Sequence, residues 1–286
     1  KEPLRLWGKV ENGQIVPATE PVITCQCIRV PVLDGHTAAV FVNFEKKPTK
    51  EQIIEKVKEY NLSITDFKEY VEMWIHEVKI PISSLILLSH NHKNQIDKRY
   101  IEQVRKLDNY IDQILYYVRS ENAEKDYLIK ETEIAKVISN VAIKNKDILL
   151  ENNINFEVEV GNTKVLTDSK WLEFIVNQIV SNSIKYIKND VEHLIKITTE
   201  ENNKNVILKI YDNGIGISKS DIPKVFDKTF TGNNGRKIET STGMGLYISK
   251  QLCKKLGHKI TVDSKENEYT EVSILFNKND FLNVAK

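Results

Sequence analysis

The sequence has little of what marks secreted or membrane-spanning chains. Its 286 residues include 3 cysteines, too few for a disulfide framework, which suits a reducing cytosol. Cys25 and Cys27 lie two residues apart, on one face of any strand, so core packing explains them better than a metal-binding pair. No apolar run approaches the roughly twenty residues that a membrane helix needs, and no signal peptide opens the sequence. These absences predict a soluble, cytoplasmic chain.

An excess of charge of either sign is also lacking. Lysine and arginine number 41 against 40 acidic residues, which gives a formal net charge of +1. Without a strong global field, nothing favours a nucleic acid or a membrane surface as a partner. Hydrophobic residues make up 41% of the chain, enough for the cores of two or three modest domains.

The first of three zones, residues 1–60, begins with β-branched and small apolar residues. Asp34 and Gly35 break this pattern with a tight-turn signal, so we expect a small β-rich segment. The zone then becomes helical. Thr49 and Gln52 form a capping-box pattern at the start of this helix.

Residues 61–122 predict two long amphipathic helices joined by a short polar turn. The apolar stripe of the first helix contains Phe67, Tyr70, Trp74, Ile75, Val78, Ile82, Leu85, Ile86 and Ser89. The stripe of the second contains Ile101, Val104, Leu107 or Asp108, Ile111, Ile114, Leu115 and Val118. Such helices form an antiparallel hairpin. One hairpin cannot bury both stripes alone, so a homodimer that makes a four-helix bundle is the economical solution.

The third zone, residues 123–286, alternates helix and strand patterns and predicts an α+β sandwich with helices on one face of a mixed sheet. The expected helices are 131–152, 169–189 and 244–257. The expected strands are 155–160, 164–168, 194–200, 205–212, 259–264 and 271–276. The loop 218–242 is longer than compact domains usually tolerate, so we expect a lid or a binding loop.

Two glycine clusters flank this loop, in "YDNGIGI" (211–217) and "STGMGLYISK" (241–250). Asp212, at the end of a predicted strand, can accept a hydrogen bond from an exocyclic amine. Gly214 and Gly216 would let the backbone approach a flat ligand and take positive φ angles. The first cluster therefore suits the base of a nucleotide.

The second cluster suits phosphate. Gly243 and Gly245 lie where a helix begins, so backbone N–H groups and the helix dipole would face an anion. On an earlier helix, Asn182 could hold a magnesium ion through its amide oxygen, and Lys185 on the same face could meet phosphate charge. Turns and helix ends explain most glycine pairs taken singly. In this order around a lid, however, they indicate a nucleotide pocket.

These segments resemble conserved boxes of a known enzyme family. The N, G1, F and G2 boxes of sensor histidine kinases are similar, in that order, to "NQIVSNSIKY", "DNGIGI", "IPKVFDKTF" and "STGMGLYISK". "WIHEVKIPIS" in the helical hairpin resembles their phosphoacceptor box. Trp74 and the lid sequence are similar to the intramembrane-sensing kinases paired with bacitracin and antimicrobial-peptide transporters. The resemblance covers about 65 to 280 and implies a Bergerat-type ATP-binding domain after a dimerisation and phosphotransfer hairpin.

The resemblance implies that ATP with Mg²⁺ phosphorylates His76, and that the phosphoryl group passes to an aspartate of a response regulator. Asn182 becomes the metal ligand and Asp212 the adenine reader. The implied cofactor-binding residues are Asn182, Lys185, Tyr186, Asp212, Gly214, Gly216, Phe226, Gly243, Gly245 and Leu246. The parent kinase of such a chain is a cell-membrane protein, so this chain would meet a membrane only through segments that it lacks.

The chemistry of the phosphoacceptor box supports this implication independently. A neutral imidazole such as that of His76 is a competent nucleophile near neutral pH. Glu77 can accept the other ring proton as a general base. Pro81 removes one backbone donor and can loosen the helix near His76. The other histidines, including the "HNH" of residues 90–92, lack supporting ligands and are expected to have no catalytic role.

Two positions depart from the family pattern. Ile80 stands where the family usually has a threonine whose hydroxyl positions water for regulator dephosphorylation. An isoleucine cannot hydrogen-bond water, so weak phosphatase activity is expected. Gln178 replaces the more common first asparagine of the N box, which is a milder change.

The N-terminal segment "CQCIRVPVLDGHTAAVFVNF" resembles a piece of aspartate-semialdehyde dehydrogenase. In that family the matching arginine and histidine, here Arg29 and His36, are active-site residues. The catalytic cysteine's segment and the nucleotide-binding domain are not recognisable, so no dehydrogenase activity is expected. We interpret residues 1–60 as a fusion cap in a chimera; a natural sensor domain is the alternative.

Two other functions remain open from the sequence. An ATP-driven conformational machine of the same nucleotide-binding superfamily would share the glycine boxes but would lack a His-Glu helix before the ATP domain. A non-catalytic dimeric binding module would not need every box intact. Both alternatives fit this sequence less well than a protein-histidine kinase.

Overall fold

The structure is a computed structural model in which the chain forms two compact units, Lys1–Tyr70 and Val71–Lys286. The residues that it describes are 9–11, 14–16, 23–28, 37–42, 48–91, 97–121, 127–188, 191–232 and 242–278. The first unit contains two antiparallel strand pairs. These are β1 (Lys9–Glu11) with β2 (Gln14–Val16), and β3 (Ile23–Ile28) with β4 (Thr37–Val42). The small β-rich segment is therefore present.

Helix α2 (Lys50–Asn91) begins in the first unit and continues into the second. The predicted capping box is confirmed. The Thr49 N–H donates to Gln52 Oε1 at 2.9 Å, and the Gln52 N–H donates to Thr49 Oγ1 at 3.2 Å. The predicted turn at residues 34 and 35 lies outside the described residues, although the register of β3 on β4, with Cys25 opposite Val40, is that of a hairpin. No described helix is both long and apolar enough to cross a membrane.

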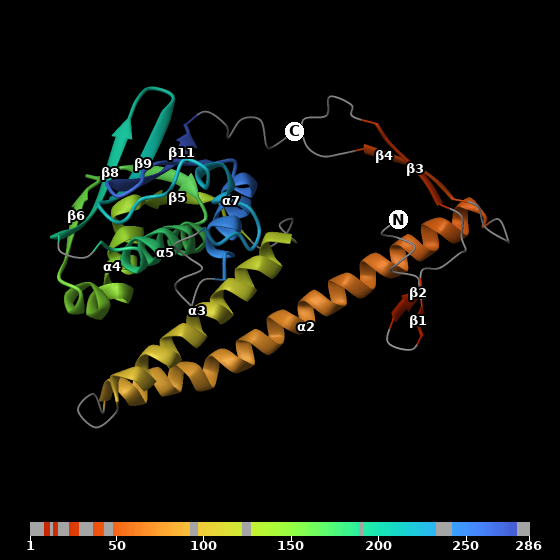
Figure 1. The fold of residues 1–286 in the computed structure, drawn as a ribbon, viewed down its shortest axis with the longest axis horizontal. Coiled ribbons are helices and arrows are strands. Elements are labelled where there is room, and N and C mark those ends of the chain that lie inside the picture. The colour runs from red at the N-terminus through yellow and green to blue at the C-terminus, as the bar shows by residue number, and fades with distance from the viewer. Residues whose placement is uncertain are drawn as a thin grey trace. The chain divides into compact units, whose positions relative to one another are not determined.

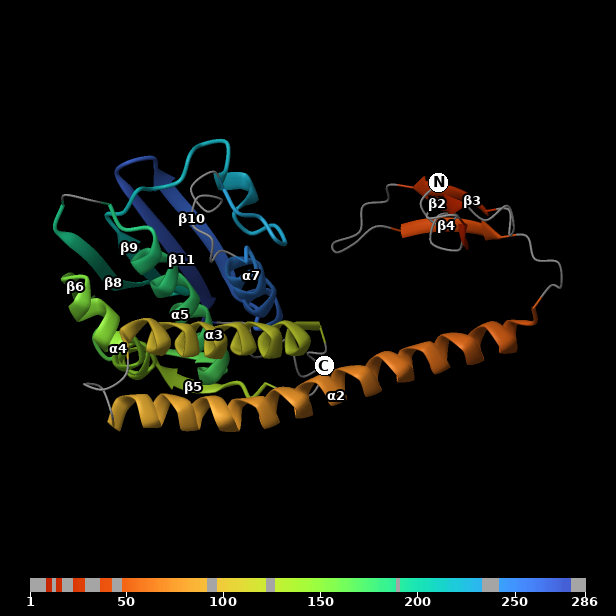
Figure 2. The ribbon, with the colours of Figure 1, turned by 60° about the horizontal axis from the view of Figure 1, so that its bottom comes forward.

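The second unit opens with the predicted antiparallel hairpin. From Val71 onward, α2 packs against α3 (Lys98–Glu121), and Figure 2 shows α3 between this part of α2 and helices α4 and α5. Ile75, Ile82 and Ile111 are its buried centre. Val71, Val78, Ile86, Val104 and Leu115 pack around them.

Part of each predicted stripe is not buried in this hairpin. The exposed members are Phe67, Tyr70, Trp74, Leu85, Leu107 and Ile114. At the position where the pattern left a choice, Asp108 is half-buried and Leu107 is exposed. The pairing of α2 with α3 uses one edge of each stripe, so an apolar surface remains for another partner.

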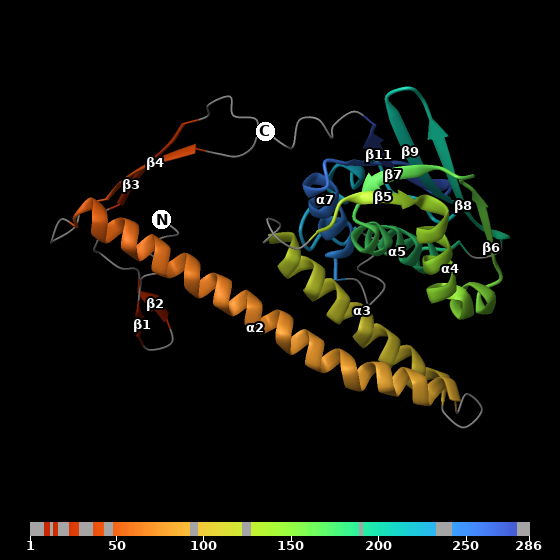
Figure 3. The ribbon, with the colours of Figure 1, turned by 180° about the vertical axis from the view of Figure 1, so that it is seen from behind.

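The remaining elements form the predicted α+β sandwich. Its sheet has the order β10-β11-β9-β8-β6, with β6 parallel to β8 and the other neighbours antiparallel. The strands are β6 (Ile154–Glu159), β8 (His193–Glu201), β9 (Asn205–Asp212), β10 (Lys259–Lys265) and β11 (Tyr269–Asn277). Helices α4 (Ile134–Glu151), α5 (Ser169–Lys185) and α7 (Gly245–Lys255) cover one face of it (Figures 1 and 3). The core between these layers includes Trp171, Leu172, Ile197, Leu208 and Ile248.

Two predicted helix boundaries were wrong. The helix expected from residue 131 starts at Ile134, because residues 130–133 form β5 (Lys130–Glu133), which pairs with β7 (Lys164–Thr167). The helix expected to end at residue 189 ends at Lys185. The next residue, Tyr186, caps the helix, and its carbonyl oxygen accepts the Ile215 N–H at 3.0 Å.

The sheet should tolerate truncation poorly at its centre. Leu208 on β9 is 0% exposed, whereas Leu150 on α4 is 66% exposed. Leu208→Ala is expected to lower the free energy of unfolding by about 2–5 kcal/mol, because it removes buried methyl groups and leaves a cavity. Leu150→Ala, the matched control, should stay within about 0.5 kcal/mol. Urea denaturation of both variants measures this, and equal stabilities would contradict the placement of β9.

Candidate functional site

A cavity of about 330 Å³ lies in the second unit, between α5, the segment after β9, the lid, the start of α7 and helix α3. Most of the predicted cofactor-binding residues line it, although they come from distant parts of the sequence. These are Asn182, Lys185, Tyr186, Asp212, Gly216, Gly243, Gly245 and Leu246. The two predicted residues that do not line the cavity are Gly214 and Phe226.

Asp212 is the last residue of β9, lines this cavity and is 8% exposed. Its carboxylate accepts the Ser183 hydroxyl at 2.8 Å and the Gly214 N–H at 3.0 Å. Burial raises the pKa of Asp212, while these two hydrogen bonds oppose the shift. Each carboxylate oxygen keeps a further lone pair, so the side chain can accept one more hydrogen bond from a ligand.

Sequence reasoning missed Ser183, which directly follows Asn182 on α5. Its hydroxyl also lies 3.3 Å from the Ile179 carbonyl oxygen, so the side chain is held between its own helix and Asp212. The only signal was a small hydroxyl residue beside the predicted metal ligand. Pairing it with Asp212 required knowledge of how α5 packs on β9.

Gly214 and Gly216 of the first cluster are each required for a different structural reason. Gly216 has a φ of 63°, and a side chain there would collide with the Lys265 backbone. Gly214 was also predicted to take a positive φ, which is wrong, since it is not among the positive-φ glycines. A Cβ at Gly214 would instead collide with the Tyr186 carbonyl oxygen, so close approach of the chain to the end of α5 requires glycine there.

The glycines of the second cluster lie at the start of α7 and line the cavity. Gly243 has a φ of 64°, and a Cβ there would lie 2.5 Å from the Thr229 carbonyl carbon. A Cβ at Gly245, the first residue of α7, would lie 2.5 Å from Gln178 Oε1. Unpaired N–H groups of a helix start favour anions. The predicted position of this cluster at a helix N-terminus beside the cavity is therefore confirmed.

Asn182 and Lys185 lie about one turn apart on α5 and both line the cavity. Burial, and next the positive charge of Lys106, lower the pKa of Lys185. Within the described residues, no group of three or more histidine, cysteine or acidic side chains could hold a metal ion. The Asn182 amide oxygen is of the kind that Mg²⁺ takes as a ligand beside phosphate oxygens. The cavity, its glycines and its lysines fit a magnesium nucleotide.

The lid contains a short 3-10 helix, η1 (Ile222–Lys224), in its described part. Phe226 packs against the main hydrophobic core, and the Lys250 ammonium lies 5.5 Å from its ring centre. Phe230, four residues later in the same box, lines the cavity instead. The sequence pattern could not show which of these two phenylalanines lines the cavity and which packs against the core.

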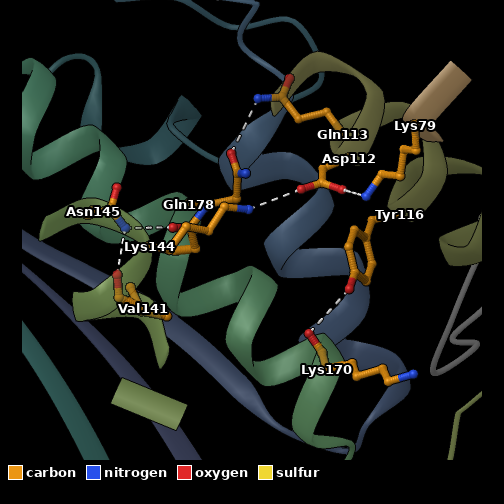
Figure 4. Close-up of polar contacts among 10 residues, drawn as sticks. Lys79, Asp112, Gln113, Tyr116, Val141, Lys144, Asn145, Lys170 and Gln178 are labelled. Carbon is orange, nitrogen blue, oxygen red and sulfur yellow. Dashed lines mark hydrogen bonds and ion pairs between the residues drawn. The ribbon is translucent and has the colours of Figure 1, made fainter. Parts of the chain in front are cut away.

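Polar side chains of helix α3 contact α4, α5 and the segment before α7. Gln113 Nε2 donates to Gln178 Oε1 at 3.4 Å (Figure 4). Gln113 Oε1 also accepts the Thr242 hydroxyl at 2.9 Å. Asp112 pairs with Lys79 of α2 and, at 3.1 Å, with Lys144 of α4. Gln178, which stands where the N box more commonly has an asparagine, therefore contacts the hairpin through its side chain.

An aromatic contact adds to these bonds. The Tyr116 ring stacks on Phe174 of α5 at a centroid distance of 4.0 Å, and its hydroxyl points to the Lys170 carbonyl oxygen, 3.4 Å away (Figure 4). Burial raises the pKa of Tyr116 to about 12, so the hydroxyl stays protonated as a donor at neutral pH. These contacts join α3 to α5 within the second unit.

His76 and Glu77 are both exposed on α2, and neither lines the cavity. Ile80, one helical turn after His76, is 59% exposed, and α2 continues through Pro81. A nucleophile presented to solvent is accessible to a separate reactive site. The other predicted positions, Arg29, His36 and the side chains of the two "HNH" histidines, lie outside the described residues.

Residues 167–280 match the family model described as "Histidine kinase-, DNA gyrase B-, and HSP90-like ATPase", and residues 1–81 match "Semialdehyde dehydrogenase, dimerisation domain". Sensor histidine kinase YxdK of Bacillus subtilis (strain 168) is 28% identical over 224 residues, which are 78% of this chain and 68% of that protein. Sensor protein kinase GraS of Staphylococcus aureus (strain JH1) is 32% identical over 224 residues, 78% of this chain and 64% of that protein.

The chain thus spans about two thirds of the length of these curated relatives. Among solved structures, Acinetobacter baumannii histidine kinase AdeS has the same fold over 72% of this chain and 98% of its own, with a TM-score of 0.53 at 22% identity. The ATPase match covers all of the residues that line the cavity except those of α3. Over most of its length the chain is thus similar to sensor histidine kinases.

Proposed function

We propose that this chain is a protein-histidine kinase that binds ATP with Mg²⁺ in the cavity, phosphorylates His76 and passes the phosphoryl group to a response-regulator aspartate. One observation carries the proposal. The fold gathers Asp212, Asn182, Lys185 and the N-terminus of α7 around one cavity, in a chain whose hairpin exposes a His-Glu pair. Each of these groups matches one chemical part of a magnesium nucleotide.

The residues of the chain would have different roles in ATP binding and phosphoryl transfer. Asp212 accepts the adenine amine, and Ser183 holds its carboxylate in place. Lys185 and the N–H groups at the start of α7 neutralise phosphate charge, which is the main demand of phosphoryl transfer. ATP, when bound, supplies the phosphoryl group. An imidazole nitrogen of His76 would form the new bond to the γ-phosphorus as the bond from this phosphorus to the bridging oxygen breaks, so that ADP leaves and Glu77 takes the ring proton.

We also propose that the chain acts as a homodimer with a histidine-phosphotransfer hairpin at 61–122 and the ATP-binding domain at 123–286. The support is the apolar surface that the hairpin leaves exposed, including Trp74, Leu85 and Leu107. A second copy of the hairpin would bury these residues in a four-helix bundle.

The subfamily and the N-terminal unit are further parts of the proposal. We infer that the chain derives from the intramembrane-sensing kinases and carries a dehydrogenase-derived cap at residues 1–60. The relatedness to GraS and YxdK supports the first part, and the match of residues 1–81 to a dehydrogenase dimerisation domain supports the second. That match extends beyond residue 60 along α2, which runs without a break through the proposed join.

Asp212→Asn is expected to weaken ATP binding by about ten- to a hundredfold, because an amide presents a donor where the adenine amine needs a charged acceptor. Calorimetric titration with ATP and Mg²⁺ measures the change. Asp263→Asn is the matched control, since Asp263 is exposed on β10 outside the cavity. Unchanged affinity in the Asp212 variant would remove this residue from the pocket.

The same variant separates binding from stability. Since burial raises the folded-state pKa of Asp212, its contribution to stability is present below the unfolded pKa and is lost as the pH rises through the folded pKa. At neutral pH, which lies above the unfolded pKa of a carboxyl group, the raised folded-state pKa therefore opposes folding. We expect Asp212→Asn to unfold at an equal or higher urea concentration than the unsubstituted chain at this pH. A large loss of stability at neutral pH would contradict this account of the carboxylate.

His76→Ala should abolish phosphate incorporation from ATP while leaving nucleotide affinity near that of the unsubstituted chain, because His76 lies outside the cavity. Radiolabel transfer under alkaline and acidic conditions measures it, since phosphohistidine is lost in acid. His92→Ala serves as the control and should label normally. Undiminished labelling of the His76 variant would contradict the proposal that His76 is the phosphorylated residue.

Ile80→Thr should speed dephosphorylation of a phosphorylated response regulator in the presence of ADP. The new hydroxyl lies one turn after His76 and can orient water toward a docked aspartyl phosphate. Autophosphorylation should stay similar, because the substitution leaves His76 and Glu77 unaltered. Ile80→Val, which adds no hydroxyl, is the control. Robust phosphatase activity in the unsubstituted chain would show that another group positions the water.

A further inference from the structure

One wall of the nucleotide cavity belongs to the hairpin. Lys106, Asn109, Tyr110 and Gln113 of α3 all line the cavity. Their spacing of three, four and seven residues puts them on one helix face. The cavity is therefore completed by a helix from outside the ATPase fold, and this helix brings a cation with it.

Lys106 and Lys185 approach each other across this cavity. Both are half-buried and both line it. After burial, the charge of Lys106 is the second cause that lowers the pKa of Lys185. Like charges in a partly closed cavity repel each other, and an anion between them would reverse the sign of the interaction.

Among the described residues, Lys106 has no acidic partner of its own. Within this part of the chain, no ion pair joins its ammonium group to an acidic side chain, whereas the neighbouring Arg105 pairs with Asp147. Of the acidic residues in the cavity wall, Asp212 ends β9, Asp221 belongs to the lid and Glu266 to the turn between β10 and β11. Lys106 thus leaves positive charge for a ligand to neutralise.

Contacts outside the cavity fix the position of Lys106. The neighbouring Arg105 pairs with Asp147 of α4 at 2.6 Å. Asp112, less than two turns later, pairs with Lys144 of the same helix at 3.1 Å. These bonds hold α3 against α4 and leave the Lys106 face turned to the cavity.

We propose that Lys106 is a second phosphate-binding cation, which contacts the polyphosphate of the bound nucleotide from the hairpin, opposite Lys185. This inference rests on the proposed binding of ATP and deepens it. Its consequence is reciprocal, because a nucleotide that binds Lys106 also stabilises the docking of α3 on the ATP-binding domain. A ligand without phosphates would gain nothing from this residue.

The test compares the affinities of the 286-residue chain for ATP, ADP and adenosine, each with Mg²⁺, by calorimetry. Lys106→Ala should weaken ATP binding by about tenfold and leave adenosine binding unchanged, because only the phosphates meet the lost charge. Lys106→Arg should restore most of the affinity. Lys136→Ala removes an exposed lysine of α4 that does not line the cavity, and it should bind all three ligands normally.

The outcomes separate the possible roles. An ATP affinity of Lys106→Ala equal to that of the unsubstituted chain overturns the inference. Equal losses for ATP and adenosine also overturn it, since they show a structural role rather than a contact with phosphate. Failure of the unsubstituted chain to bind ATP would instead contradict the proposed function itself. A selective loss of ATP and ADP, rescued by arginine, supports the inference.

Discussion

The carboxylate of Asp212 lies inside the second unit at the end of β9, where little water can solvate it. Such a group is tolerated only when hydrogen bonds replace the lost water. Ser183 and the Gly214 N–H supply them, which requires the end of α5 to meet the chain directly after β9. The early end of α5 and the absence of a side chain at Gly214 follow from this contact.

Local patterns predicted the parts of this arrangement that depend on neighbours in the sequence. The strand 205–212 was predicted with its observed bounds, because its residues alternate between buried and half-buried. The capping box of Thr49 and Gln52 likewise involves residues three apart. Strand β5 was missed, because its partner β7 is about thirty residues away and because "ETE" also suits the start of a helix. Ser183 was missed for the same reason, since its partner Asp212 lies on another element.

The hairpin shows a different limit of sequence patterns. Periodicity identified both helices and their apolar stripes correctly, but it could not assign each residue to a particular neighbour. Ile75 is 1% exposed and Trp74 is 47% exposed, although both belong to the same predicted stripe. The apolar stripe is wider than the surface that one neighbouring helix can cover. Some of its residues therefore pack against α3, and the others stay exposed. Only the packing of α2 on α3 separates the two sets.

The wall that α3 contributes to the cavity makes the pocket a composite surface. A small molecule that contacted only lining residues within 167–280 would meet the part of the cavity that matches the ATPase family model. A molecule extended toward Tyr110 and Gln113 would also meet side chains of the hairpin, which lie outside that match. Its affinity would depend on the contact between α3 and the rest of the cavity, so such a compound would serve as a chemical probe of that contact.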